Sequence, residues 1–148
     1  DETFASLIAN ALPRYHVDND GSSGWGTAQS LIMCQRELSR ENPPAAMIYT
    51  FISNHLGRNY LRKSWHGRMF PAASFPLFDI VDGKLTYIGM KNHSEALEPD
   101  NDATMRKEYE ITCALIQRMH DLCREKNVRF AFTVVSEIGP DLSGPILE

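Results

Sequence analysis

The sequence lacks the long apolar runs and the excess of positive charge that mark membrane-spanning or nucleic-acid-binding chains. No apolar run reaches the roughly 18–20 residues needed to cross a bilayer, and no basic stretch followed by an apolar core opens the chain. The formal net charge is −4 at pH 7, which gives no general electrostatic attraction to polyanions. We therefore expect no nucleic-acid partner, and we see no membrane span and no signal peptide in this segment.

Cysteine is scarce, and its pattern argues against a disulfide framework. The three cysteines, Cys34, Cys113 and Cys123, are an odd number and fall in segments with helical periodicity. We interpret them as reduced and mostly packed thiols. The histidines at positions 16, 66, 93 and 120 have no metal-ligand spacing, so the sequence predicts no metal site. No cofactor is expected either, because the chain has no Walker lysine and no good dinucleotide-binding fingerprint.

What is present is the composition of one ordinary globular domain. The chain has 148 residues, of which 43% are hydrophobic and 23% are charged, and a domain of this size buries roughly two thirds of its unfolded surface. Apolar side chains recur at helical spacing over residues 4–12, 27–42 and 104–126, which predicts amphipathic helices there. Pro13 ends the first of them, and Pro43 and Pro44 end the second.

Short apolar segments between these helices predict strands. Residues 45–53 form a near-continuous apolar run, typical of a parallel strand covered on both faces, and residues 128–135 form a second such strand. Residues 14–19 alternate and predict a short strand, while residues 77–81 and 85–88 predict a hairpin turned by Asp82 and Gly83. Helices that alternate with strands favour an α/β fold with a mainly parallel sheet, from which the hairpin is an excursion.

Two polar motifs follow two of these predicted strands. The pattern Asn-x-Gly-x-x-Gly-x-Gly-Thr-x-Gln covers residues 19–29, where a strand ends and a helix begins, and Asn54 comes directly after the strand at 45–53. Ligands collect at the carboxyl ends of parallel strands, where a glycine lets a backbone N–H approach a reacting oxygen. We therefore expect the Gly24 N–H and the Asn54 side-chain amide to face one cleft.

Both motifs resemble conserved blocks of the SGNH (GDSL-like) hydrolases. Residues 19–29 look like the family's second block, residues 52–55 look like its third, and residues 104–135 are similar to a later helix-strand unit. The resemblance implies a three-layer α/β/α sandwich and a serine esterase or lipase-like acylhydrolase that acts through an acyl-enzyme. It also implies that Gly24 and Asn54 donate hydrogen bonds to the oxyanion, with a small-molecule ester or an acylated carbohydrate as substrate.

The chain departs from the family's pattern at three places. The third block is usually Gly-x-Asn-Asp, whereas Ile52 and His55 stand at its first and last positions here. No Gly-Asp-Ser block precedes the first helix, and no Asp-x-x-His block follows residue 135. We therefore interpret residues 1–148 as a single SGNH-like domain without its N-terminal nucleophile strand and C-terminal histidine segment. The missing strand would lie between those ending near Asn19 and Ser53.

Each site residue also has a simpler interpretation. Gly24 could serve only the geometry of a tight turn, and Asn54 could cap a following helix. His55 is a candidate substrate contact or a polar residue at a helix start. The alternative functions are a carbohydrate O-acetyltransferase of the same fold, in which a sugar hydroxyl replaces water, and a non-catalytic α/β binding module.

Overall fold

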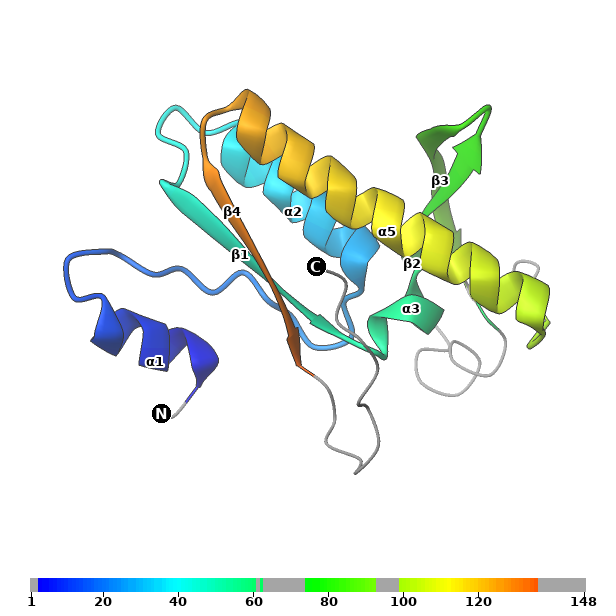
Figure 1. The fold of residues 1–148 in the computed structure, drawn as a ribbon, viewed down its shortest axis with the longest axis horizontal. Helices are drawn as coiled ribbons and strands as arrows, with labels where there is room; N and C mark the ends of the chain where they lie inside the picture. Colours follow the sequence, from blue (N-terminus) through cyan, green and yellow to red (C-terminus); the bar gives the residue numbers. More distant parts are fainter. Residues whose placement is uncertain (1–2, 61, 63–73, 93–98, 136–148) are drawn as a thin grey trace, which may run out of the picture.

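The computed structural model describes residues 3–60, 62, 74–92 and 99–135, and Figure 1 shows its fold. Within these ranges the chain is a mixed α/β structure with one parallel and one antiparallel pair of strands. The helices are α1 (Phe4–Ala11), α2 (Thr27–Leu38), α3 (His55–Arg58) and α5 (Asp102–Glu125). The strands are β1 (Ala46–Ile52), β2 (Ser74–Val81), β3 (Lys84–Asn92) and β4 (Arg129–Val135). In this part of the chain no helix is long and apolar enough to cross a membrane.

The parallel pair joins β1 to β4 in a register that runs from Ala46 opposite Arg129 to Ile52 opposite Val135. Both strands were predicted from their apolar runs, and both predictions are confirmed within one or two residues. The reversal from α5 into β4 has a local cause. Asn127 lies at φ 56°, and the Val128 N–H donates to the Cys123 carbonyl at 2.8 Å, which is the hydrogen bond of a Schellman cap.

The main core lies where α2 and α5 run side by side against one face of the parallel pair (Figure 1). Ile111, Leu115 and Met119 recur at four-residue spacing on α5 and are almost fully buried. The prediction that residues 45–53 are covered on both faces is wrong for the described part of the chain. Met47, Tyr49 and Phe51 face the core, but Ile48 on the opposite face is 47% exposed, because both helices pack on the same side.

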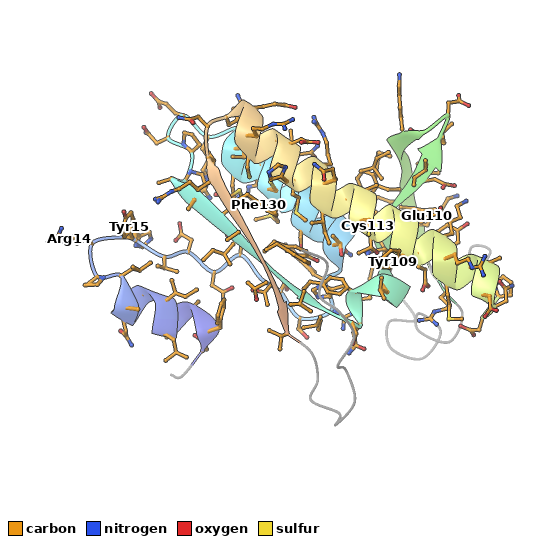
Figure 2. All side chains as sticks on the ribbon, viewed as in Figure 1. Arg14, Tyr15, Tyr109, Glu110, Cys113 and Phe130 are labelled. Carbon is orange, nitrogen blue, oxygen red and sulfur yellow. The ribbon has the colours of Figure 1, made fainter. Side chains whose placement is uncertain are left out.

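The predicted strand at residues 14–19 is also wrong. These residues are irregular, and Tyr15 is 54% exposed at the bend after α1 (Figure 2). A strand persists only when its N–H and C=O groups pair with a neighbouring strand, and residues 14–19 pair with none of the described strands. Apolar alternation at Tyr15 and Val17 alone therefore does not make this segment a strand.

The first two predicted helices form, although the second is shorter than its apolar pattern suggests. Helix α1 begins after Thr3, whose side chain accepts a hydrogen bond from the Ser6 N–H, and ends before Pro13, while its Phe4 and Leu7 side chains stay exposed. Helix α2 ends at Leu38 rather than Asn42. A proline at position 43 would clash with the carbonyl of Ser39 in a continued helix, so the helix ends before that residue.

The predicted hairpin is confirmed and is longer than expected. Strands β2 and β3 pair in antiparallel register, with Ser74 opposite Asn92 at one end and Val81 opposite Lys84 at the other. Asp82 and Gly83 have φ values of 50° and 73°, the positive pair that a type I′ turn requires. The hairpin projects beside α5, and buried Phe78 connects it to the main core.

Candidate functional site

The glycine loop, residues 21–26, contains a tight turn with Gly24 inside it. The Trp25 N–H donates to the Ser22 carbonyl at 3.2 Å, and Gly24 occupies the third position of this turn at φ 84°. This geometry matches a type II turn, which requires glycine at that position. The turn's hydrogen bond does not use the Gly24 N–H, and no described residue accepts from it.

Asn54 lies between β1 and α3 but does not cap the helix with its side chain. Its backbone is in the right-handed helical region at φ −61° and ψ −20°, and its side chain makes no capping hydrogen bond. A capping asparagine normally has extended backbone geometry and accepts from the first turn. The capping interpretation of Asn54 is therefore not supported, and its half-buried amide is not committed to the helix start.

The glycine loop rests directly on α3. The Arg58 guanidinium donates through Nη1 to the Trp25 carbonyl at 2.6 Å. A Cβ atom at Gly26 would lie 2.9 Å from the Arg58 Cβ and 3.0 Å from the Asn59 Oδ1. Gly26 is therefore required for close approach of the two segments. The structure thus brings together the two motifs on which the sequence interpretation depends, although they stand about thirty residues apart.

Asn59 connects this contact to the interior. Its side chain is 1% exposed, and its Oδ1 accepts from the Ala28 N–H at 3.2 Å. Its Nδ2 donates to the Thr27 Oγ1 at 3.0 Å and to the Thr112 Oγ1 at 2.7 Å. Gly26, the residue before α2, has no side chain to cap the helix, so Asn59 supplies that acceptor from a distant part of the chain.

Tyr49 extends the same network to His55. The Tyr49 hydroxyl donates to the Thr27 Oγ1 at 2.9 Å, and the His55 Nδ1 lies 3.0 Å from the same hydroxyl. Because a hydroxyl carries one hydrogen, the His55 Nδ1 must be the donor to Tyr49. The His55 Nε2 is then the unprotonated nitrogen and can accept a hydrogen bond.

Burial sets the charge of both residues. Desolvation, with a smaller contribution from the positive charge of Arg58, lowers the pKa of His55 to about 4. Desolvation raises the pKa of Tyr49 to about 12, against the opposing effect of its hydrogen bonds. Both side chains are therefore neutral at pH 7. His55 also packs edge-on against Phe51, with ring centroids 5.6 Å apart, so one side of its ring is covered.

The structure therefore places the three predicted site residues on two segments that touch. Gly24, Asn54 and His55 are all half-buried, and His55 has a defined partner in Tyr49. That Gly24 and Asn54 share one cleft stays a prediction. Sequence reasoning missed the polar network that holds the segments, formed by Thr27, Tyr49, Arg58, Asn59 and Thr112. A lone tyrosine inside an apolar strand was a usable signal, because a buried hydroxyl needs a partner.

Arg58 stands near Arg62, Lys63 and Arg68 in the sequence, and such a local basic cluster is most often a solvated helix face. Instead Arg58 binds the glycine loop. Arg62 pairs with Glu108 at 3.1 Å and Asp100 at 3.6 Å. Lys63 and Arg68 lie outside the described residues. The two described arginines are thus committed to partners within the chain rather than to solvent.

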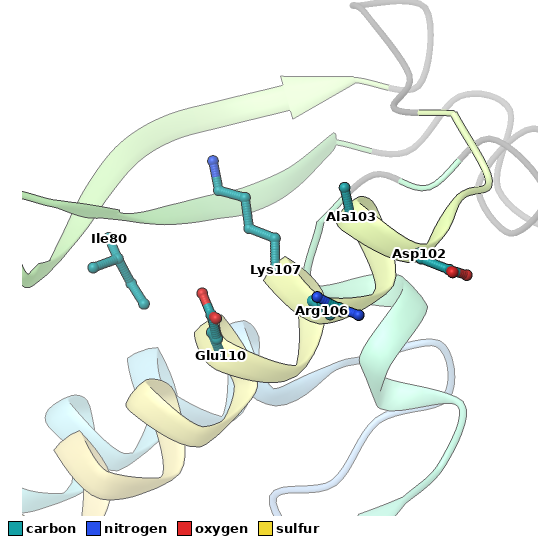
Figure 3. A pocket seen from close by; sticks show the side chains of 6 residues that line it. All are labelled: Ile80, Asp102, Ala103, Arg106, Lys107 and Glu110. Atoms are coloured by element: carbon teal, nitrogen blue, oxygen red, sulfur yellow. The ribbon is translucent and has the colours of Figure 1, made fainter.

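A groove of about 590 Å³ lies elsewhere, between β2 and the first turns of α5 (Figure 3). Its lining mixes charges of both signs, and Lys107 is already paired with Asp79 at 2.9 Å. Gly24, Asn54 and His55 do not line it. The groove therefore gives no support to a second catalytic centre.

Comparisons with protein-family models, with curated proteins and with solved structures find no match to this chain. The function is therefore argued from the residues and their geometry.

Proposed function

We propose that residues 1–148 belong to an SGNH-type ester hydrolase in which the Gly24 N–H and the Asn54 side-chain amide stabilise the oxyanion. The observation that carries the proposal is the direct contact of the glycine loop with α3, the helix that begins right after Asn54. The serine nucleophile and the catalytic histidine would come from segments outside residues 1–148. The substrate would be a small-molecule ester or an acylated carbohydrate.

The state of the two donors supports this proposal. An oxyanion site works because its donors are fixed and aimed before the negative charge develops. The Gly24 N–H has no partner among the described residues, and the Asn54 side chain is not used to cap α3. The segments that carry both donors are held by buried hydrogen bonds of Asn59. The Gly24 N–H is thus available to a ligand as far as the described residues show, which supports its proposed role.

The three-layer sandwich is part of the same proposal. In the described chain β1 pairs with β4 along one edge, and no described strand pairs with its other edge. Ile48 on the face away from α2 and α5 is 47% exposed. The proposed nucleophile strand would add to the second edge of β1, and a further helical layer would cover the exposed face. The serine at the end of that strand would then lie near Asn54, because parallel strands end at the same edge.

The test is ester hydrolysis by the complete natural protein that contains these residues. Wild-type protein should release p-nitrophenol from p-nitrophenyl acetate and should be labelled by a fluorophosphonate at a serine. Asn54→Ala should lower kcat by about 10²–10³, the usual loss for one oxyanion donor, without loss of folding. Asn42→Ala, at an exposed asparagine, is the matched control and should keep wild-type kcat.

Absence of serine labelling together with unchanged turnover in Asn54→Ala would contradict an acyl-enzyme. Labelling with transfer of the acyl group to an added sugar, in place of release to water, would instead identify the O-acetyltransferase of the same fold. A protein that binds ligands without labelling or turnover would be the binding module.

A further inference from the structure

The Arg58 side chain makes a long-range contact from a helix of only four residues. Its Nη1 donates to the Trp25 carbonyl at 2.6 Å, across 33 positions of the chain. The side chain is half-buried, and its Cβ lies only 2.9 Å from where a Cβ on Gly26 would be. The contact is therefore made to the backbone of the glycine loop rather than to another side chain, and it fixes the loop's path.

This bond completes a two-sided restraint on Trp25, the residue that follows Gly24. On one side the Trp25 N–H is held by the Ser22 carbonyl at 3.2 Å, and on the other the Trp25 carbonyl is held by Arg58. Both backbone polar groups of Trp25 thus have a hydrogen-bond partner. The Gly24 N–H belongs to the Ser23–Gly24 peptide, which is the central peptide of the turn closed by the Ser22–Trp25 hydrogen bond, so holding Trp25 at both of its backbone groups restrains its direction. A donor fixed in this way needs no reorganisation when charge develops on a bound ligand.

The contact is separable from the stability of the fold. The start of α2 is held independently by Asn59, which binds Ala28 and Thr27 in the interior. Arg58 contributes no side chain to the main hydrophobic core. Removal of its guanidinium should therefore release the glycine loop while α2, α3 and α5 stay packed. Lysine is a poor replacement, because its ammonium nitrogen lies one bond nearer the backbone than the Arg58 Nη1 that makes this contact.

We propose that Arg58 is a positioning residue that aims the Gly24 N–H by holding the Trp25 carbonyl. This inference rests on the proposed ester hydrolase function for its catalytic consequence, but the effect on the loop does not depend on that function. Helix α3 would then serve both proposed donors, because it follows Asn54 and also carries the residue that holds the glycine loop. One end of the helix follows Asn54, and the other end sets the orientation of the second donor.

The catalytic test uses the complete natural protein and compares Arg58→Ala and Arg58→Lys with Arg124→Ala, a control at a side chain that is 71% exposed. We expect Arg58→Ala to lower kcat about ten- to a hundredfold with KM within about twofold, the scale of a donor misplaced by about 1 Å. Added methylguanidinium should restore part of the kcat of Arg58→Ala and none of that of Asn54→Ala. An Arg58→Ala kcat within twofold of wild type, or a change in KM alone, would overturn the proposal.

A second measurement separates this inference from the proposed function. In ¹⁵N-labelled protein, Arg58→Lys should shift the backbone amide resonances of Gly24 and Trp25 but leave that of Ala28 nearly unchanged, because Asn59 still holds it. If the wild-type protein shows no ester hydrolysis, the proposed function fails. Shifted Gly24 and Trp25 resonances in Arg58→Lys would still support the inference that Arg58 holds the loop. Unmoved Gly24 and Trp25 resonances would overturn it whatever the activity.

Discussion

The Oδ1 of Asn59 accepts a hydrogen bond from the Ala28 N–H at 3.2 Å, so a residue at the end of α3 caps a helix that begins 32 positions earlier in the chain, at Thr27. Asn59→Leu should therefore leave the Ala28 N–H buried and unpaired. We expect the free energy of unfolding to fall by about 2–3 kcal/mol, the range for an unsatisfied buried polar group with further lost partners. Urea denaturation measures this free energy of unfolding. Asn42→Leu, at an exposed site, should change it by less than about 0.5 kcal/mol.

Gly26 has to remain without a side chain. Gly26→Ala would place a Cβ 2.9 Å from the Arg58 Cβ, close to the backbone of α3, where the neighbour yields little. We expect a loss of about 1–3 kcal/mol, as for other overpacked sites. In Gly21→Ala the added atom would meet only the end of the exposed Asn19 side chain, at 3.1 Å. Equal denaturation midpoints for the two variants would show that α3 does not pack tightly on the glycine loop.

His55 should make the stability of the fold depend on pH. Its folded pKa of about 4 lies below the value of 6.5 for an exposed histidine, so the unfolded chain binds the proton more readily between these values. The stabilisation is complete above pH 6.5 and is lost as the pH falls towards 4. Between pH 7 and pH 5 we expect a loss on the order of 1–2 kcal/mol, allowing for the ring's partial exposure.

The comparison for His55 is a His55→Gln variant. The glutamine side chain at position 55 does not titrate in this pH range. Its unfolding free energy should fall less between pH 7 and pH 5 than that of the wild type, as measured by urea denaturation at each pH. Parallel losses in the two proteins would mean that the buried environment of His55 is not the cause.

The thiols should differ sharply in reactivity. Cys113 is exposed on α5 (Figure 2), whereas Cys34 and Cys123 are buried, each with its Sγ 3.7 Å from the Met47 Sδ. Desolvation raises the pKa of Cys34 to about 12 and also raises the pKa of Cys123, so both remain protonated thiols at pH 8. With Ellman's reagent we expect rapid reaction of one thiol in the folded protein and of three in urea. A Cys113→Ser variant that still reacts rapidly when folded would contradict this arrangement.

The sequence predicted those parts of the fold whose pattern is local. The stripe on residues 104–126, the apolar runs that became β1 and β4, and the positive-φ turn at Asp82 and Gly83 each depend on neighbours a few positions away. The segment 14–19 failed because a strand needs a partner, which its own residues do not encode. The site residues divide in the same way, into those set by local motifs and those set by distant partners.

Gly24, Asn54 and His55 could be proposed from two short motifs, but the residues that hold them could not. Asn59 meets Ala28 and Thr112 across 31 and 53 positions, and an asparagine after a four-residue helix carries no sign of such partners. Arg58 shows the opposite error, because an arginine near other basic residues suggests a solvated cluster until the Trp25 carbonyl is found beside it. Hydrogen bonds between distant segments arise only once the chain has folded.

The pairing of β1 with β4 also has a consequence for the order in which the chain folds. Its first partners, Ala46 and Arg129, are 83 residues apart, whereas Val81 and Lys84 close the hairpin across a two-residue turn. Closing a long loop costs more chain entropy and takes longer than forming a hairpin, which needs about 1–10 μs. We therefore expect amides of β2 and β3 to gain protection from hydrogen exchange before those of β1. The strand end that presents Asn54 would then form after the hairpin, so a chain with only the hairpin formed would lack an assembled site.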